Sequence, residues 1–319
     1  MKVCTAMESG MAPTTPPTHF AYRQVDVFSR VPFSGNGLTV FLEAEGLPTS
    51  AMQRITQEMR QFESIFLRGT RGAAVTEARL FTMEEELDFA GHPVLGAACV
   101  LHERQPQLGR YASWRIQLHA GVVPVTTTRH ETWYDATMDQ GKPIFGAVAP
   151  PELQQALLNA LNLEPKQLDS SVPMQMVSTG LPYLLVPLAS GLERAAITHP
   201  QFEALLAQIG AKFVYVFDVA RLEGRTWDNG GRVEDVATGS AAGPLGAYLV
   251  RYGRARPGEA ITLRQGRFIG RPSEMTVRVT GIADAQDAVL VSGAVAFVGQ
   301  GTLDATSLLT AQADAPGTH

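Results

Sequence analysis

Four side chains spread along this chain could together transfer protons: Glu63, His92, Asp235 and Ser240. Carboxyl and imidazole groups can take up and release protons near neutral pH when their surroundings tune them. Asp235 and Ser240 stand five residues apart, at the beginning of small and apolar residues that predict a buried helix. The unpaired N–H groups of such a helix start attract an anion. These residues favour acid/base chemistry on a small anionic ligand.

Glu63 lies in the segment 61–67, whose length and aromatic and β-branched content predict a strand. The period of two puts Glu63 on the same face as Ile65 and Leu67. A carboxyl group on an apolar face is salt-bridged, has a raised pKa, or both. Glu63 is therefore either a structural ion-pair partner or a general acid/base.

A second buried helix is predicted from Gly91 and His92 to residue 101, with Pro93 in its first turn. A histidine at a helix start is either a capping or core group or a catalytic one. Both halves of the chain read as strands, a helix, a strand and then a glycine-led apolar helix. This parallel suggests a pair of pseudo-symmetric α/β domains, each with a sheet wrapped around one buried helix.

The elements around these helices follow from hydrophobic periodicity. Strands are expected at 20–28, 38–42, 61–67 and 78–82, as a run over 113–140, and at 173–177, 181–186, 213–218, 260–263, 275–279 and 289–298. Helices are expected after Pro48 and at 152–161 and 201–209. The expected organisation is a disordered leader at 1–18, domains at 19–135 and 136–308, and a loose tail at 309–319. In one interpretation, the last strand near 290–305 completes the first domain.

Composition excludes several classes of protein. The 319 residues are 45% hydrophobic with a net charge of −5, so we expect no nucleic-acid or anionic-membrane surface. No apolar stretch of about 18 residues is present to span a bilayer. Two cysteines and seven histidines show no disulfide or metal-binding spacing, so no metal is expected. The sequence predicts a cytoplasmic protein, and it contains no dinucleotide-binding, phosphate-loop or serine-hydrolase motif.

The chain resembles the phenazine-biosynthesis PhzF family, within the diaminopimelate-epimerase-like fold. The resemblance covers about Phe20 to Leu303 and depends on six blocks in the right order. They are Val25-Asp26-Val27-Phe28 with Gly35-Asn36, Glu63-Ser64-Ile65-Phe66, Phe89-Ala90-Gly91-His92-Pro93, Ser178-Thr179-Gly180, Glu234-Asp235 with Thr238-Gly239-Ser240-Ala241-Ala242-Gly243, and Gln265-Gly266 with Gly270-Arg271-Pro272-Ser273.

The resemblance implies an α+β protein of two similar domains, each a curved mixed β-sheet around a central α-helix, with the ligand in the cleft between them. It implies that Glu63 is the general acid/base and that His92, Asp235 and Ser240 position the ligand and handle protons. Four residues are assigned to substrate binding: Gly91, Gly239, Asn36 and Thr238. The family further implies a cofactor-free isomerisation of a dihydro-hydroxyanthranilate by a homodimer.

Three departures from the family pattern matter. Phe62 precedes Glu63, where the family commonly has a small polar residue, and Val236 follows Asp235, where proline is usual. Gly37 and Met83 also stand where proline is frequent. These departures bear more on which substrate is bound than on the core chemistry. We therefore expect an isomerase that moves a proton on a small, cyclic or acyclic, carboxylate.

Two other functions are compatible with the sequence. A two-base epimerase or racemase of the same fold would need two thiols at the helix starts, where this chain has His92 and Ser240. A small-ligand-binding protein could have kept the cleft without turnover. The presence of all four polar residues favours an enzyme.

Overall fold

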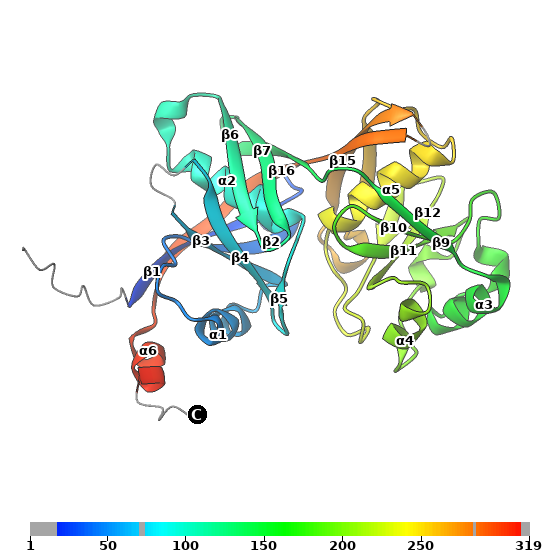
Figure 1. Ribbon diagram of the computed structural model, residues 1–319, viewed down its shortest axis with the longest axis horizontal. Coiled ribbons are helices and arrows are strands. Elements are labelled where there is room, and N and C mark those ends of the chain that lie inside the picture. The colour runs from blue at the N-terminus through cyan, green and yellow to red at the C-terminus, as the bar shows by residue number, and fades with distance from the viewer. Residues whose placement is uncertain (1–17, 70–73, 283–284, 314–319) are drawn as a thin grey trace, which may run out of the picture.

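The computed structural model describes residues 18–69, 74–282 and 285–313 (Figure 1). All but the last residue of the predicted leader at 1–18 lies outside this range, as do residues 314–319 of the predicted tail. Figure 1 shows two domains side by side, each with a sheet packed around one helix. The predicted fold class is confirmed.

The N-terminal domain is a closed sheet around α2 (His92–Glu103). Its strands are β1 (His19–Val27), β2 (Asn36–Phe41), β3 (Glu63–Arg68), β4 (Thr76–Thr82), β5 (Glu86–Leu87), β6 (Tyr111–Leu118), β7 (Gly121–Arg129) and β8 (Trp133–Asp139). The sheet closes because β16 (Ala285–Asp304) pairs with β1 on one side and with β8 on the other. The sheet is mixed, since β2 and β3 are parallel and β1 and β2 antiparallel.

The C-terminal domain continues the same sheet around α5 (Gly239–Arg251). Its strands are β9 (Ile144–Val148), β10 (Gln175–Ser178), β11 (Pro182–Leu188), β12 (Phe213–Asp218), β13 (Glu223–Arg225), β14 (Ile261–Gln265) and β15 (Ser273–Ile282), which pairs with β16. The remaining helices are α1 (Thr49–Met59), α3 (Pro151–Ala160), α4 (Phe202–Ala207) and α6 (Thr306–Ala313), with 3₁₀ turns at Pro106–Leu108, Pro165–Gln167, Leu192–Arg194 and Arg267–Ile269.

Glycines let both central helices approach their sheets closely. A Cβ on Gly96 of α2 would lie 2.5 Å from Leu38 Cδ2 of β2, and one on Gly246 of α5 would lie 2.4 Å from Val277 Cγ1 of β15. The same packing device therefore recurs in the two domains. It explains why both helices are built from small residues.

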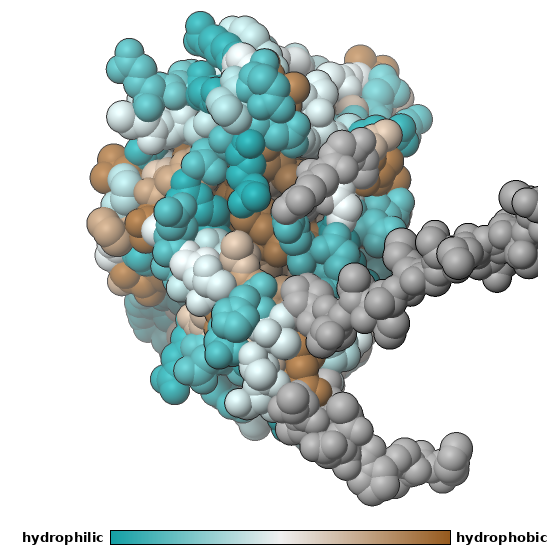
Figure 2. Space-filling model, turned by 90° about the vertical axis from the view of Figure 1, so that its left-hand side faces the viewer, coloured by the Kyte–Doolittle hydropathy of each residue, from teal (hydrophilic) through white to brown (hydrophobic). Residues whose placement is uncertain are grey.

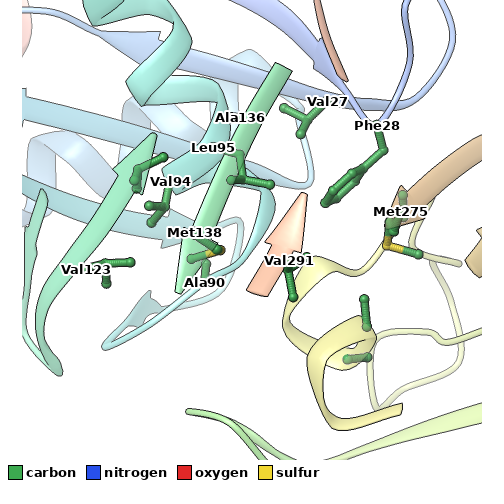
Figure 3. Packing of buried hydrophobic residues seen from close by; sticks show 14 of the residues in the cluster. Val27, Phe28, Ala90, Val94, Leu95, Val123, Ala136, Met138, Met275 and Val291 are labelled. Atoms are coloured by element: carbon green, nitrogen blue, oxygen red, sulfur yellow. The ribbon is translucent and has the colours of Figure 1, made fainter. Parts of the chain in front are cut away.

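A single hydrophobic core connects the two domains (Figure 3). The cluster includes Leu95 of α2, Leu245 of α5 and Val291 of β16, and all three are fully buried. Phe28, which follows β1, packs between the domains, because a Cβ on Gly239 of α5 would lie 2.8 Å from its ring and one on Gly293 of β16 would lie 2.2 Å from it. The interface between the domains is thus apolar and close-packed.

A polar contact also joins the domains beside this core. Arg271, between β14 and β15, donates to Asp26 Oδ1 at 2.7 Å and to the Gly35 carbonyl at 2.8 Å. Burial raises the pKa of Asp26, while the Phe33 backbone N–H and Arg271 act in the opposite direction. The contact holds the turn before Asn36 against the C-terminal domain.

The outer face of the N-terminal domain carries mostly hydrophilic side chains with hydrophobic ones between them (Figure 2). The alternation is visible in β8, where every second residue is buried. The buried face of β8 packs on α2, and the residues between are half-buried.

The structure bears on the predicted C-terminal tail and on the predicted domain boundary. The tail expected to be loose at 309–319 is helical as far as Ala313, because Leu308 and Leu309 of α6 pack against a hydrophobic cluster beside α1. The predicted boundary between residues 135 and 136 falls within β8, and β16 belongs to both sheets. The division into 19–135 and 136–308 therefore stays a prediction.

Candidate active site

Glu63 is the first residue of β3, and its side chain faces the core around α2 together with Ile65 and Leu67. It is 7% exposed, and among the described residues its Oε2 has no hydrogen-bond partner. Burial, with a smaller contribution from the negative charge of Asp235, raises the pKa of Glu63 to about 8. This carboxyl group can exchange a proton close to neutral pH.

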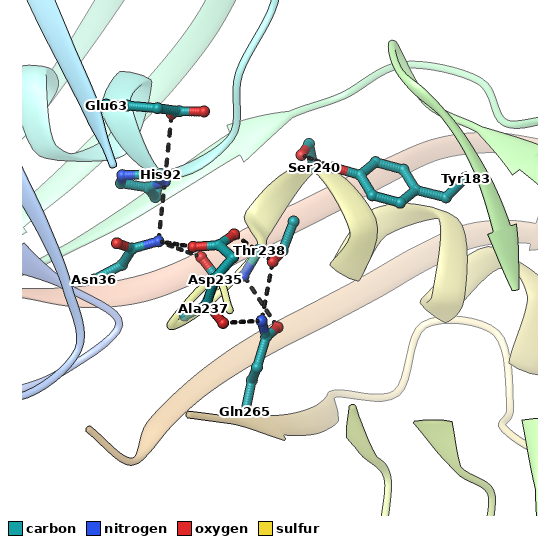
Figure 4. A network of polar contacts seen from close by, with 9 residues as sticks. All are labelled: Asn36, Glu63, His92, Tyr183, Asp235, Ala237, Thr238, Ser240 and Gln265. Carbon is teal, nitrogen blue, oxygen red and sulfur yellow. Dashed lines mark hydrogen bonds and ion pairs between the residues drawn. The ribbon is translucent and has the colours of Figure 1, made fainter. Parts of the chain in front are cut away.

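His92 is the first residue of α2 and lies beside Glu63, with 3.6 Å between His92 Nδ1 and Glu63 Oε2 (Figure 4). Burial lowers the pKa of His92 to about 3, so the imidazole is neutral. Its Nδ1 lies 3.4 Å from the Asn36 amide nitrogen, whose two hydrogens also serve Asp235 Oδ1 and the Ala237 carbonyl. One of them is therefore shared with an Nδ1 lone pair, which places the imidazole proton on Nε2. Nε2 is buried without a partner among the described residues. A ligand oxygen would satisfy this N–H group.

Asn36, the first residue of β2, connects the two domains. Its side-chain N–H groups donate to Asp235 Oδ1 at 2.7 Å and to the Ala237 carbonyl at 2.8 Å. The side chain is therefore used to hold Asp235 beside His92. The sequence assigned Asn36 to substrate binding, and that role stays a prediction.

Asp235 is buried and surrounded by donors. Its Oδ1 accepts from Asn36 and its Oδ2 from the Thr238 hydroxyl, and the backbone N–H groups of Val236 and Ala237 also bond to the carboxylate. Burial raises the pKa of Asp235, and these hydrogen bonds act against that rise. Asp235 is thus better suited to orient a ligand than to carry the proton.

Gln265 is a site residue that the sequence did not single out. It lies at the end of β14, donates to the Asp235 carbonyl at 2.8 Å and accepts from the Thr238 backbone N–H at 3.1 Å. Its presence in the Gln265-Gly266 block was the available signal. Gln265 fixes the loop that carries Asp235.

The two helix starts touch each other. A Cβ on Gly91 would lie 2.5 Å from the Ser240 backbone nitrogen, and a Cβ on Gly239 would lie 3.2 Å from the His92 backbone nitrogen. Two N-terminal helix dipoles therefore converge where Glu63, His92 and Ser240 meet. Positive dipole ends brought together in this way favour a negatively charged group.

Ser240, the second residue of α5, is held from the C-terminal domain by Tyr183 of β11, with 2.8 Å between the two hydroxyl oxygens. Nothing in the sequence singles out Tyr183 beyond its place in an apolar strand. The structure thus brings all four acid/base candidates to one buried cluster, each at most 7% exposed.

Residues 18–69, 74–282 and 285–313 contain no group of three or more His, Cys, Asp or Glu side chains placed to hold a metal ion. In the same part of the chain, no helix has the length and hydrophobicity needed to cross a bilayer.

The raised pKa of Glu63 predicts how stability depends on pH. Between the ordinary value of 4.5 and about 8, the folded protein keeps the Glu63 proton that the unfolded chain releases. This contribution to stability is therefore complete below pH 4.5 and is lost as the pH rises through 8. We expect the free energy of unfolding of the wild type, relative to Glu63→Gln, to fall between pH 5 and pH 9. Urea unfolding of both proteins measures this, and parallel pH profiles would contradict it.

Two similar domains, each a sheet around a central helix, define an epimerase-like fold. The polar cluster lies where the two central helices meet. The chain belongs to the phenazine biosynthesis-like protein family, whose model matches residues 25–301. It is 34% identical over 289 residues to a trans-2,3-dihydro-3-hydroxyanthranilate isomerase of Pseudomonas fluorescens, covering 88% of this chain and 98% of the relative. It is 32% identical to the uncharacterised isomerase YddE of Escherichia coli, covering 84% and 93% of the two chains.

Solved structures agree with this membership. A protein from Pseudomonas aeruginosa described as a predicted epimerase superposes with a TM-score of 0.83 at 46% identity, covering 89% of this chain and 99% of its own. A PhzF-family phenazine biosynthesis protein of Bacillus anthracis gives 0.77 at 27% identity over the same shares. The names of these relatives support an isomerase.

Proposed function

We propose that this protein is a cofactor-independent isomerase that moves a proton on a small carboxylate, with Glu63 as the single general acid/base. The observation that carries the proposal is a buried carboxyl group with a pKa of about 8 and an unpartnered oxygen beside His92. A group that must accept a proton and return it works best with a pKa near the working pH.

The proposed reaction balances without another reactant. Glu63 carboxylate takes a proton from a C–H group, and the electron pair of that bond forms a new double bond to the neighbouring carbon. The existing double bond of that carbon opens toward its far carbon. The far carbon of the displaced double bond then takes the proton back from the Glu63 carboxylic acid. No net oxidation occurs, so a redox cofactor is not required.

The surrounding groups supply donors for the charge that develops. The neutral His92 offers Nε2–H, and the helix starts at Gly91 and Gly239 offer backbone N–H groups next to a ligand carboxylate. Asp235 would accept from a ligand amine or hydroxyl, with Thr238 and Asn36 fixing its orientation. Closure of the domains limits contact with water, so only part of the transferred proton exchanges with solvent before it is returned.

A two-base epimerase is less well supported by this geometry. It would need a second proton carrier near neutrality opposite Glu63. Ser240 and Tyr183 occupy that side, and burial moves the pKa of Tyr183 upward, further from neutrality. The pKa of His92 is shifted in the opposite direction, to about 3.

The decisive experiment uses the compound named for the relatives. Wild-type protein is incubated with trans-2,3-dihydro-3-hydroxyanthranilate in D2O and followed by NMR and mass spectrometry. We expect isomerisation, with deuterium at the carbon that receives the proton. Binding of the compound without isomerisation or exchange would contradict the proposal and indicate a ligand-binding protein.

The homodimer and the cytoplasmic location expected from the sequence belong to this proposal as well. Sedimentation of the purified protein at micromolar concentration measures the first, and cell fractionation the second. A monomer, or recovery outside the cytoplasm, would contradict them.

A further inference from the structure

The hydroxyl groups of Tyr183 and Ser240 leave one hydrogen without a protein acceptor. Tyr183 is 4% exposed and Ser240 7%, so neither hydroxyl is well solvated. The pair holds two hydrogens, and the 2.8 Å contact between the oxygens uses one of them. In the part of the chain that the structure describes, neither oxygen has another hydrogen-bond partner. A buried donor without a partner costs free energy unless a ligand completes it.

The direction of the bond between them follows from acidity. A phenol is a stronger acid than an aliphatic alcohol, so it is the better donor. Burial raises the pKa of Tyr183, and the negative charges of Asp235 and Glu63 raise it further, so the phenol keeps its proton. The 2.8 Å contact fits a hydrogen bond in either direction. With the phenol as the donor to Ser240 Oγ, the Ser240 hydroxyl hydrogen is the one left over.

The free hydrogen lies where an anion would bind. Ser240 begins α5, and its backbone nitrogen touches the start of α2 at Gly91. Figure 4 shows Tyr183 approaching Ser240 from the side away from His92 and Asp235. A carboxylate oxygen at the two helix starts would accept from the Ser240 hydroxyl in addition to the backbone N–H groups.

We propose that Tyr183 is a positioning residue that fixes the Ser240 hydroxyl as a donor to the substrate carboxylate, and so makes the protein selective for carboxylates. This inference rests on the proposed function, because it concerns the ligand of the same site. Without the phenol, the Ser240 hydroxyl rotates freely and its oxygen loses its donor. The ligand carboxylate then loses an oriented hydrogen bond.

The test compares two probes that differ only in the carboxylate, anthranilate and aniline. We expect Tyr183→Phe to weaken anthranilate binding about tenfold, as for the loss of a hydrogen bond to a charged group, and to leave aniline unchanged. Ser240→Ala should give a similar loss. The double variant should lose little more than either single one, because both changes remove the same interaction. Isothermal titration calorimetry measures all four proteins.

The matched control is Tyr248→Phe. Tyr248 is a buried tyrosine of α5 whose hydroxyl donates to the Pro173 carbonyl at 2.6 Å, away from the site. It should leave anthranilate binding unchanged. With trans-2,3-dihydro-3-hydroxyanthranilate, Tyr183→Phe should raise KM more than it lowers kcat, which a general loss of stability would not produce.

Several results would overturn the inference. They are equal weakening of anthranilate and aniline, additive losses in the double variant, or wild-type protein that does not prefer anthranilate. Failure of the proposed function looks different. If anthranilate binding depends on Tyr183 but no proton is ever exchanged, the catalytic proposal is wrong and the carboxylate subsite stands.

Discussion

Glu63→Gln is expected to lower kcat with trans-2,3-dihydro-3-hydroxyanthranilate by at least about 10³-fold and to abolish deuterium exchange into the ligand. Glutamine has the shape of glutamate but cannot accept a proton from carbon. The side chain is buried and its pKa of about 8 shows that the site tolerates the neutral form, so the fold should be retained. NMR detection of exchange, together with calorimetric binding of the same ligand, separates chemistry from binding.

Glu77→Gln is a suitable control for this experiment. Glu77 lies on β4 with its side chain exposed, in the same domain, so the same glutamate-to-glutamine substitution is made there without touching the site. Binding should be nearly unchanged in both variants. Exchange that persists in Glu63→Gln would show that another group carries the proton.

The second large effect is expected for Gly91→Ala. The new Cβ would lie 2.5 Å from the Ser240 nitrogen and 2.6 Å from the Gly239 carbonyl carbon, and these are backbone atoms that no rotamer change can move away. The helix starts must therefore separate, which weakens the hydrogen bond from Asn36 to Asp235 between the domains. We expect kcat/KM to fall about 10²-fold and the free energy of unfolding to fall by about 1–3 kcal/mol.

Steady-state kinetics and urea unfolding measure these two effects. Gly299→Ala in β16 is the control, because its Cβ would meet only Gln24 Oε1, at an ordinary 3.7 Å. Full activity in Gly91→Ala would mean that close contact between the helix starts is not needed for catalysis.

Much of the fold could be predicted because the decisive patterns are local. The small residues of 239–249 and 91–101 identified both central helices, and alternation in 61–67 gave the face of Glu63. α6 was missed because the helix is stabilised by Leu308 and Leu309 packing on a distant cluster, which no local pattern reveals. The three-residue strand β13 is too short to have a period.

The site could be predicted in composition but not in arrangement. The bond between Asn36 and Asp235 joins residues 199 apart in sequence, and that between Tyr183 and Ser240 joins residues 57 apart. Such contacts depend on how two domains dock, which one sequence does not show. The shift in the pKa of Glu63 likewise depends on its burial and, to a smaller extent, on Asp235 from the other domain.

The strand shared by the two sheets has a consequence for synthesis of the chain. The N-terminal barrel closes only when residues 295–304 pair with β1, although its other strands all precede residue 140. During synthesis on the ribosome, the edges of β1 and β8 that pair with β16 therefore stay unpaired until almost the whole polypeptide has been made. Exposed strand edges are templates for association with other chains, and pairing over such sequence distances is slow. Newly made chains are thus most prone to aggregation before β16 has emerged. Pairing of β16 with β1 and β8 then removes the unpaired edges.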